Sequence, residues 1–385
     1  MLLPVPISHA PIHERAKWTR DRRTVERRVA RWRRKSWVDA RAEKFGLSRA
    51  WYADDEWWET LAIKQTDIDT REVDRNNRVA IPWEVLIMKG LANQGCRNVA
   101  GLRKYKLFMS RDQDRDHSPK MRWRYYLEYH KHGTLEGLVQ RYREYNQRHP
   151  KHKDYLPEAF IWQAFYDFAQ AAYHMSVVRF DDSVAPPGKD HFVLHLDLKH
   201  ENVLMCEPST VRNLMDYPTL KVADWGLAEY TSREDVNNSK KWKYYGTIVW
   251  TPPEQRNEGT YGRNWRHPVL GSSNHPFTMA HVIWQMGANI YGLMELDLHN
   301  LDIHTRVNYY EKSETSLRQD GYSVLSGWQN LRYSSKLRAL VDDCLLVDPA
   351  RRPSVADLLE RTQEGIRRFA DAARRDGGPP EVRLS

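Results

Sequence analysis

The sequence predicts an α+β fold in which a small strand-rich portion with one helix precedes a larger, mainly helical portion. Residues 36–70 form short, β-like runs rich in Trp, Tyr and aliphatic side chains. Residues 159–175 instead form a long apolar and aromatic stretch with the character of a core helix. The boundary between the two portions is expected near residues 129–133, where a strand pattern ends at a glycine turn.

Local signals place the other elements of the strand-rich portion. Residues 60–64 are its clearest strand pattern, and residues 122–129 alternate like a second strand. The one helix is expected over residues 84–91, because apolar residues recur there at helical spacing after Pro82, a helix-start signal. These elements predict a small sheet with a single helix before the chain becomes mostly helical.

Length and composition exclude several classes of protein. The 385 residues, 41% of them hydrophobic, suffice for one large two-lobed domain or two ordinary ones. No stretch reaches the roughly 18 uninterrupted apolar residues of a spanning helix, and the N-terminus is a poor secretory signal. Three widely spaced cysteines argue against a disulfide framework or a zinc site. We therefore expect an intracellular protein with reduced thiols, in the cytoplasm, the nucleus or both.

Positive charge is concentrated at the N-terminus. Residues 1–45 hold thirteen Lys and Arg against five Asp and Glu, which accounts for most of the net charge of +9. We interpret residues 1–35 as a basic extension. Two interpretations stay open at this point: an arm that contacts nucleic acid or an acidic surface, or a solvated and partly disordered segment.

The strongest chemical signal is the stretch 195–202, which reads His-Leu-Asp-Leu-Lys-His-Glu-Asn. Phosphoryl transfer to a hydroxyl needs a carboxylate that orients the hydroxyl and accepts its proton, a positive charge on the migrating group, and a metal ligand. Asp197, Lys199 and Asn202 supply these three groups within one short loop. Downstream, an apolar strand delivers Asp224 to a turn, which makes Asp224 a second candidate metal ligand.

These two motifs resemble the catalytic-loop and metal-binding triplets of the eukaryotic-type protein kinase superfamily. The sequence is also similar to divergent Ser/Thr kinases of filamentous fungi. The resemblance implies a two-lobed protein kinase fold, with a small antiparallel β lobe plus one helix and a large, mainly α-helical lobe. The domains it implies are a basic N-terminal extension at 1–35, an N-lobe at 36–129, a C-lobe at 130–372 and a C-terminal tail at 373–385.

The resemblance also implies how ATP and Mg²⁺ would be held. Lys64 matches the lysine that binds the ATP phosphates, with Glu84 as its ion-pair partner, while Asn202 and Asp224 match the metal ligands. The remaining ATP-binding residues would surround the adenine or offer it backbone groups: Ala62, Leu127 as gatekeeper, Glu128, His130 and Leu204.

The activation segment and its anchor are implied in the same way. Thr247 lies at the end of the segment, and Glu254 in the run Thr-Pro-Pro-Glu would be buried against Arg352. This arrangement shapes a groove for a protein substrate. Lys199, two residues after the catalytic Asp197, favours Ser or Thr over Tyr as the acceptor.

Three departures from the family pattern bear on activity. Residues 45–51 hold one glycine where the family has three in its phosphate loop, so we expect weaker ATP binding or a substitute contact. Leu196 replaces an Arg that grips an activation-loop phosphate, so control by phosphorylation there is less expected. Val282 replaces an Asp that holds the catalytic loop, so this loop needs another support. Hydroxyl groups that remain available in the segment are those of Thr231, Ser232, Ser239 and Tyr245.

Four functions are consistent with these features. The first is an active Ser/Thr protein kinase that uses ATP and Mg²⁺ on a protein substrate. The second is a pseudokinase that acts as a scaffold or allosteric regulator with weak or no turnover. The third is a small-molecule kinase of the aminoglycoside or choline type, against which the Thr-Pro-Pro-Glu run argues. The fourth is a nucleic-acid contact made by the basic arm.

Overall fold

The computed structural model describes residues 38–40, 43–52, 57–68, 81–110, 120–130, 132–180, 190–208, 217–235, 238, 242, 245–255, 276–297, 332–376 and 382. The described chain divides into two compact units. One holds the chain up to Lys89 together with Ala100–Tyr129, and the other holds Gly90–Val99 together with the chain from His130 onward. The basic extension expected at 1–35 lies outside the described residues.

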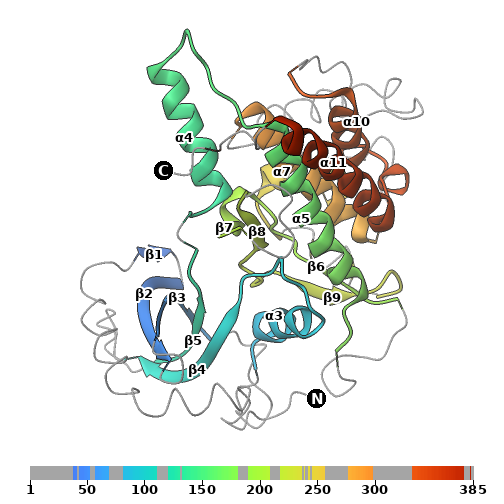
Figure 1. The fold of residues 1–385 in the computed structure, drawn as a ribbon. Helices are drawn as coiled ribbons and strands as arrows, with labels where there is room; N and C mark the ends of the chain where they lie inside the picture. Colours follow the sequence, from blue (N-terminus) through green and yellow to red (C-terminus); the bar gives the residue numbers. More distant parts are fainter. Residues whose placement is uncertain are drawn as a thin grey trace. The chain divides into compact units, whose positions relative to one another are not determined.

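The first unit is built on one antiparallel sheet with the strand order β1-β2-β3-β5-β4 (Figure 1). A helix, α3 (Trp83–Asn93), begins directly after Pro82, as the sequence predicts. Its buried Val85 packs with Trp123 and Tyr125 of β5 to form the apolar core of this unit. The strands are β1 (Val38–Ala40), β2 (Glu43–Tyr52), β3 (Trp57–Asp67), β4 (Leu102–Ser110) and β5 (Lys120–Glu128).

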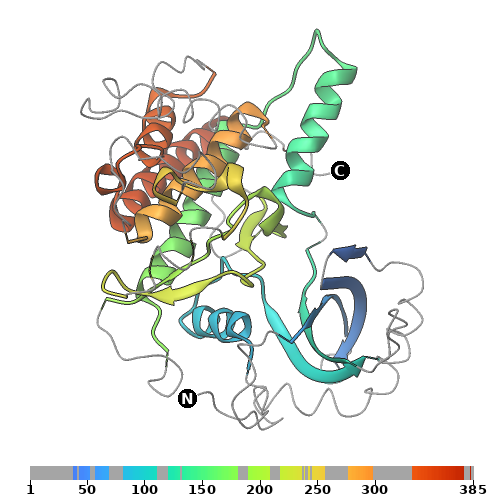
Figure 2. The ribbon, with the colours of Figure 1, turned by 180° about the vertical axis from the view of Figure 1, so that it is seen from behind.

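The second unit is mainly helical and is organised around α5 (Glu158–Val177). Thirteen of the twenty residues of α5 are buried, which makes it the core helix expected from residues 159–175. It packs against α7 (Met279–Glu295) and α11 (Val355–Asp376), and α10 (Ser335–Cys344) packs on α7 (Figure 1; Figure 2). The helical packing supports the short strands that carry the motifs.

Two small antiparallel pairs frame the motif residues. β6 (Phe192–Leu194) pairs with β9 (Glu229–Thr231), and β7 (Val203–Cys206) pairs with β8 (Thr219–Val222). The loop between β6 and β7 contains residues 195–202 and ends in a 3-10 helix, His200–Asn202. Asp224 lies two residues after β8, behind Ala223. The first motif connects β6 to β7 and the second connects β8 to β9, so both run between the same two strand pairs.

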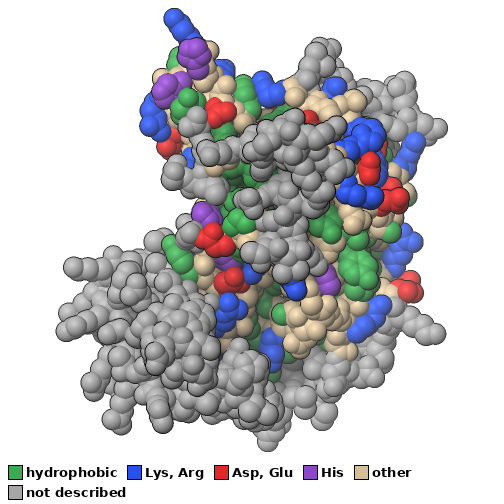
Figure 3. All heavy atoms as spheres, in the orientation of Figure 1, with side chains coloured by type: hydrophobic (Ala, Val, Ile, Leu, Met, Phe, Trp, Pro, Cys, Tyr) green, Lys and Arg blue, Asp and Glu red, His purple; other side chains and the backbone are tan. Residues whose placement is uncertain are grey.

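The helix α4 (Leu135–Arg148) begins at the N-cap Thr134, whose side chain accepts a hydrogen bond from Gly137, and it leads into an exposed basic segment. Asn146 and Asp154 close this segment with two reciprocal hydrogen bonds of 2.8 and 2.6 Å. Figure 3 shows Lys, Arg and His side chains gathered at this tip. Its exposed members are Arg148, His149, Lys151, His152 and Lys153.

The prediction of a mixed fold is confirmed in its coarse form: antiparallel strands with one helix come first, and a mainly helical portion follows. All three cysteines are buried and free, as expected for reduced thiols. Within the described residues, no helix combines the length and apolarity needed to span a bilayer.

Candidate functional site

The carboxylate of Asp197 lies in a network of polar groups within the second unit. Its Oδ1 accepts hydrogen bonds from the backbone N–H of Thr247 at 2.9 Å and from the Thr247 hydroxyl at 2.8 Å. Its Oδ2 accepts from the side-chain amide of Asn202 at 3.2 Å and lies 3.4 Å from Nζ of Lys199. Lys199 also donates to the Thr247 hydroxyl at 2.9 Å. The structure thus brings together four of the residues singled out in the sequence.

Asn202 connects this loop to the strand that carries Asp224. Its side-chain nitrogen donates to the backbone carbonyl of Asp197 at 2.8 Å. Its backbone carbonyl accepts a hydrogen bond from the N–H of Ala223 at 2.9 Å. Because the amide nitrogen bonds to Asp197, the amide oxygen of Asn202 is the atom suited to bind a cation. Together with the Asp224 carboxylate it provides two hard oxygen donors, the type that Mg²⁺ prefers.

His195 forms a second link between the same two segments. Its Nδ1 accepts from the N–H of Asp197 at 3.3 Å, so Nε2 carries the proton and donates to the carbonyl of Ala223 at 3.0 Å. Complete burial lowers the pKa of His195, and this outweighs the opposing effects of the Ala223 carbonyl and of two nearby carboxylates. The imidazole is therefore neutral at pH 7. Trp225 packs on it with ring centroids 4.7 Å apart.

Three positions with positive φ determine the backbone path through the site. Leu196 and Asp224 adopt the left-handed region with φ of 62° and 59°, which costs each non-glycine residue about 1–3 kcal/mol. Gly246 has φ of 80°, and a Cβ at this position would collide with the carbonyl oxygen of Leu196. Glycine at 246 is therefore required both by its φ and by the close approach of the catalytic loop.

The first unit contains the buried ion pair expected from the sequence. Nζ of Lys64 lies 3.0 and 3.2 Å from the two carboxylate oxygens of Glu84 on α3, and both side chains are buried. On the same strand, Ala62 pairs with Leu127 of β5, and both are half-buried. Glu128 exchanges hydrogen bonds with the backbone of Gly101.

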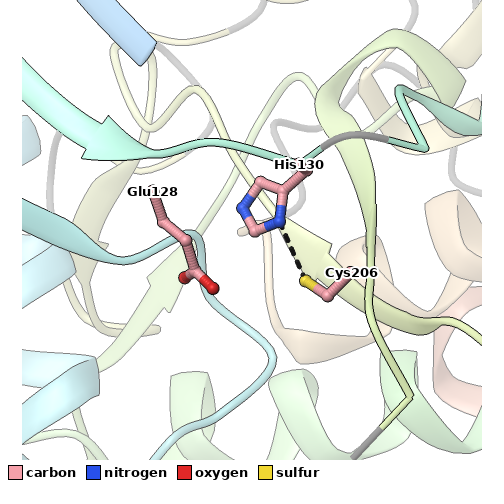
Figure 4. Close-up of side chains that lie close together, drawn as sticks. All are labelled: Glu128, His130 and Cys206. Carbon is pink, nitrogen blue, oxygen red and sulfur yellow. Dashed lines mark hydrogen bonds between the residues drawn. The ribbon is translucent and has the colours of Figure 1, made fainter. Parts of the chain in front are cut away.

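The other two residues predicted to bind ATP belong to the second unit. Leu204 lies in β7 and is half-buried, and a bridge joins it to Thr134. The side chain of His130 is buried, with Nδ1 only 3.0 Å from Sγ of Cys206 (Figure 4). The roles of these residues toward adenine stay predictions.

The stretch 45–51, which holds one glycine where the family's phosphate loop has three, is part of a strand. Residues 45–51 lie within β2, where they pair in register with residues 58–64 of β3. The backbone N–H groups of β2 that face β3 serve the sheet ladder, so they cannot close over phosphates. Ala40 of β1 pairs with Glu43 of β2, so residues 41–42 form the connection between these two strands. That connection lies outside the described residues.

The anchor that the family resemblance predicts for the activation segment is present as a buried, bidentate ion pair. Arg352 donates to both carboxylate oxygens of Glu254 at 2.8 Å and to the backbone carbonyls of Leu346, Val347 and Ala280. Burial raises the pKa of Glu254, but the guanidinium of Arg352 outweighs burial and lowers it overall. Glu254 is therefore charged and matched by a partner with fixed geometry.

The same segment is held by two neutral side chains that the sequence reasoning missed. Asn238 donates to the carbonyls of Ser232 and Phe277 and accepts from the N–H of Phe277. Gln255 donates to the carbonyls of Trp242 and Tyr245. These amides bind backbone groups at both ends of the described part of the segment.

The availability of two hydroxyl groups in this segment is also corrected. Thr231 has no exposed surface, and its hydroxyl donates to Asp235 at 3.0 Å. Ser232 is only 7% exposed. Neither hydroxyl is accessible to another kinase in this conformation. Ser239 lies outside the described residues, and Tyr245 is half-buried.

Three polar residues of α7, which the sequence reasoning also missed, do leave a signal in the sequence. His281, Gln285 and Asn289 recur at every fourth position of α7, which is otherwise apolar, and all three are completely buried. Buried polar side chains are rare unless they are hydrogen-bonded. A polar stripe on an apolar helix therefore predicts fixed partners, even where it does not identify them.

Comparisons with known proteins agree with this geometry. Residues 189–362 match the model of the protein kinase domain. The G2-specific protein kinase nim-1 of Neurospora crassa is 25% identical over 61% of this chain and 24% of its own length. The G2-specific protein kinase nimA of Emericella nidulans is 23% identical over 61% of this chain and 29% of its own length.

A relative outside the fungi is the serine/threonine-protein kinase TAO3 of Gallus gallus, 25% identical over 50% of this chain and 16% of its own length. This chain thus spans less than a third of the length of each of these relatives. The matched region contains both motif loops, the Glu254–Arg352 pair and helix α7. Residues 189–362 are therefore similar to the domain of eukaryotic-type protein kinases.

Proposed function

We propose that this chain transfers the γ-phosphate of ATP to Ser or Thr hydroxyls of a protein substrate. The observation that carries the proposal is the Asp197 carboxylate, held by Thr247, Asn202 and Lys199 within one loop system. A carboxylate held in this way can orient a hydroxyl and accept its proton. The relatives whose names describe Ser/Thr protein kinases support the choice of acceptor.

Each remaining group has a proposed part in the transfer. Lys199, 3.4 Å from Asp197, would place positive charge on the migrating phosphoryl group. Lys64, oriented by Glu84, would hold the ATP phosphates. Asn202 and Asp224 would hold Mg²⁺, which when bound offsets the charge of the phosphates. The two compact units would be the two lobes of the kinase fold, with Ala62, Leu127, Glu128, His130 and Leu204 in contact with the adenine.

A protein substrate is favoured over a small molecule by the rigid anchor of the activation segment. The run Thr251–Glu254 is fixed by the buried Arg352 pair, while Ile248 just before it is 58% exposed. A fixed backbone with an exposed apolar side chain suits contact with an extended polypeptide. The substrate itself stays part of the proposal.

The decisive test is phosphate incorporation from labelled ATP with Mg²⁺ into casein, and into the chain itself. Asp197→Ala should lower incorporation by a factor of about 10²–10⁴, because the proton acceptor is lost. Asp224→Ala should be similarly inactive through loss of a metal ligand. The control is Glu360→Ala, which removes an exposed carboxylate on α11 and should retain wild-type activity. Equal incorporation by wild type and Asp197→Ala would overturn the proposal in favour of a pseudokinase.

A further inference from the structure

The catalytic loop of this chain rests on a helix face that lacks the expected acid. Val282 on α7 occupies the position where the family resemblance expects an Asp, and it has no exposed surface. An apolar side chain cannot accept hydrogen bonds from the loop. The question is which side chains on this face of α7 bind the loop instead.

Asn289 lies on the same face, seven residues further along, which is two turns of helix. Its side-chain nitrogen donates to the carbonyl of Leu198 at 3.2 Å and to the carbonyl of Gln285 within α7 at 2.8 Å. Leu198 stands between Asp197 and Lys199 in the chain. A bond to its carbonyl therefore restrains the peptide that joins the two reactive side chains.

His200 provides a second bond in the opposite direction. Its Nε2 donates to the backbone carbonyl of Asn289 at 2.8 Å. The ring is completely buried and packs edge-on against Trp250, with centroids 4.8 Å apart. It also lies over Gly292, where a Cβ would come within 2.5 Å of the ring. Gly292 thus leaves the space that His200 occupies on α7.

We propose that Asn289 and His200 are positioning residues that together hold the Asp197 loop on α7, in place of the missing carboxylate at position 282. One bond runs from the helix side chain to the loop backbone, and the other from the loop side chain to the helix backbone. The reciprocal arrangement fixes both the distance and the rotation of the loop relative to the helix. The inference rests on the proposed function, because it assigns these residues a part in the geometry of Asp197.

The first measurement is steady-state kinetics of Asn289→Leu and His200→Leu, which keep the volume but remove the donors. We expect kcat per folded molecule to fall between about 10-fold and 100-fold, since small displacements of reacting groups have effects of this size. KM for ATP should stay within about twofold, because neither residue binds ATP. The double variant should lose little more than either single variant, because both bonds support one contact.

The control is Thr362→Val, which removes a completely buried side-chain hydrogen bond in α11, remote from residues 195–202 in sequence and packing. It should lower the unfolding temperature without changing kcat per folded molecule. A purely structural role for Asn289 predicts the same behaviour for Asn289→Leu. Unchanged kcat per folded molecule in Asn289→Leu would therefore overturn the proposal.

The second measurement does not depend on turnover. Amide hydrogen exchange should become at least about tenfold faster in a peptide that covers residues 195–204 of Asn289→Leu. Thr362→Val should leave that peptide unchanged. If wild type proves no more active than Asp197→Ala, the proposed function fails, but exchange still decides whether Asn289 and His200 hold the loop. Equal exchange in wild type and Asn289→Leu would refute that.

Discussion

The two ends of α7 hold neighbouring segments by different chemistry. Near its N-terminus, Arg352 bonds to Glu254 and to the carbonyl of Ala280, so a buried pair of opposite charges carries the contact. Toward its C-terminus, the neutral side chains of Asn289 and His200 bond to backbone carbonyls. Both contacts are completely buried, yet only the first contains charge.

The two types of contact differ in how well they tolerate the loss or replacement of one partner. A buried charge that loses its partner is left in a medium that solvates it poorly, so the pair works only as a whole. A neutral donor needs only one carbonyl as its acceptor. Several types of side chain, at several helix positions, can supply such a donor. The charged anchor matches the family pattern, whereas the neutral one lies at a new position two turns of α7 beyond Val282.

The largest expected effect comes from breaking the charged anchor. Arg352→Met leaves Glu254 buried and unpaired, which should lower the free energy of unfolding by about 3–5 kcal/mol. The matched control is Arg361→Met, whose pairs with Asp343 and Asp357 are partly exposed and should each contribute only about 0–1 kcal/mol. Urea denaturation followed by circular dichroism measures both. Similar losses in the two variants would remove the distinction between the buried charged anchor and an ordinary surface pair.

A smaller loss is expected from a neutral clamp. Asn238→Ala removes three hydrogen bonds to backbone groups of Ser232 and Phe277 and leaves those groups buried. The free energy of unfolding should fall by about 1–3 kcal/mol, less than for Arg352→Met, since no charge is stranded. The same urea experiment measures it. A loss as large as that of Arg352→Met would contradict the ranking of charged over neutral contacts.

The smallest expected effect is the pH dependence of stability that His281 causes near the N-terminus of α7. Burial lowers the pKa of His281 to about 4; Glu254 opposes this shift, Arg352 adds to it, and the ring bonds to Gln255 at 2.7 Å. As pH falls below about 6.5, the unfolded chain binds a proton at His281 that the folded chain does not bind, so stability is lost toward acid. From pH 6.5 to 5.5 this loss should be about 1 kcal/mol.

The variant His281→Gln removes the titrating group while keeping a polar side chain next to Gln255. Its free energy of unfolding should fall by about 1 kcal/mol less than that of wild type over the same pH interval. Other buried histidines titrate alike in both proteins, so the difference isolates His281. Identical pH slopes would show that His281 is not kept neutral by the fold.

The sequence by itself determined the residues whose chemistry depends on local spacing or on recognisable motifs. Asp197, Lys199 and Asn202 lie within six positions, so any fold that forms this loop brings them close together. The pairs Lys64–Glu84 and Glu254–Arg352 were predicted from the resemblance of their sequence segments to the kinase family. These contacts are present at 2.8–3.2 Å.

Only the tertiary structure decided how the catalytic loop and activation segment are supported. Asn289, His200, Asn238 and Gln255 bond mainly to backbone carbonyls, which every residue possesses and which therefore leave no mark in the partner's sequence. The placement of residues 45–51 in β2 likewise depended on pairing with β3, a long-range contact that a single glycine does not reveal. The reactive side chains could be recognised from local sequence, whereas the side chains that bond to backbone groups could be identified only in the folded chain.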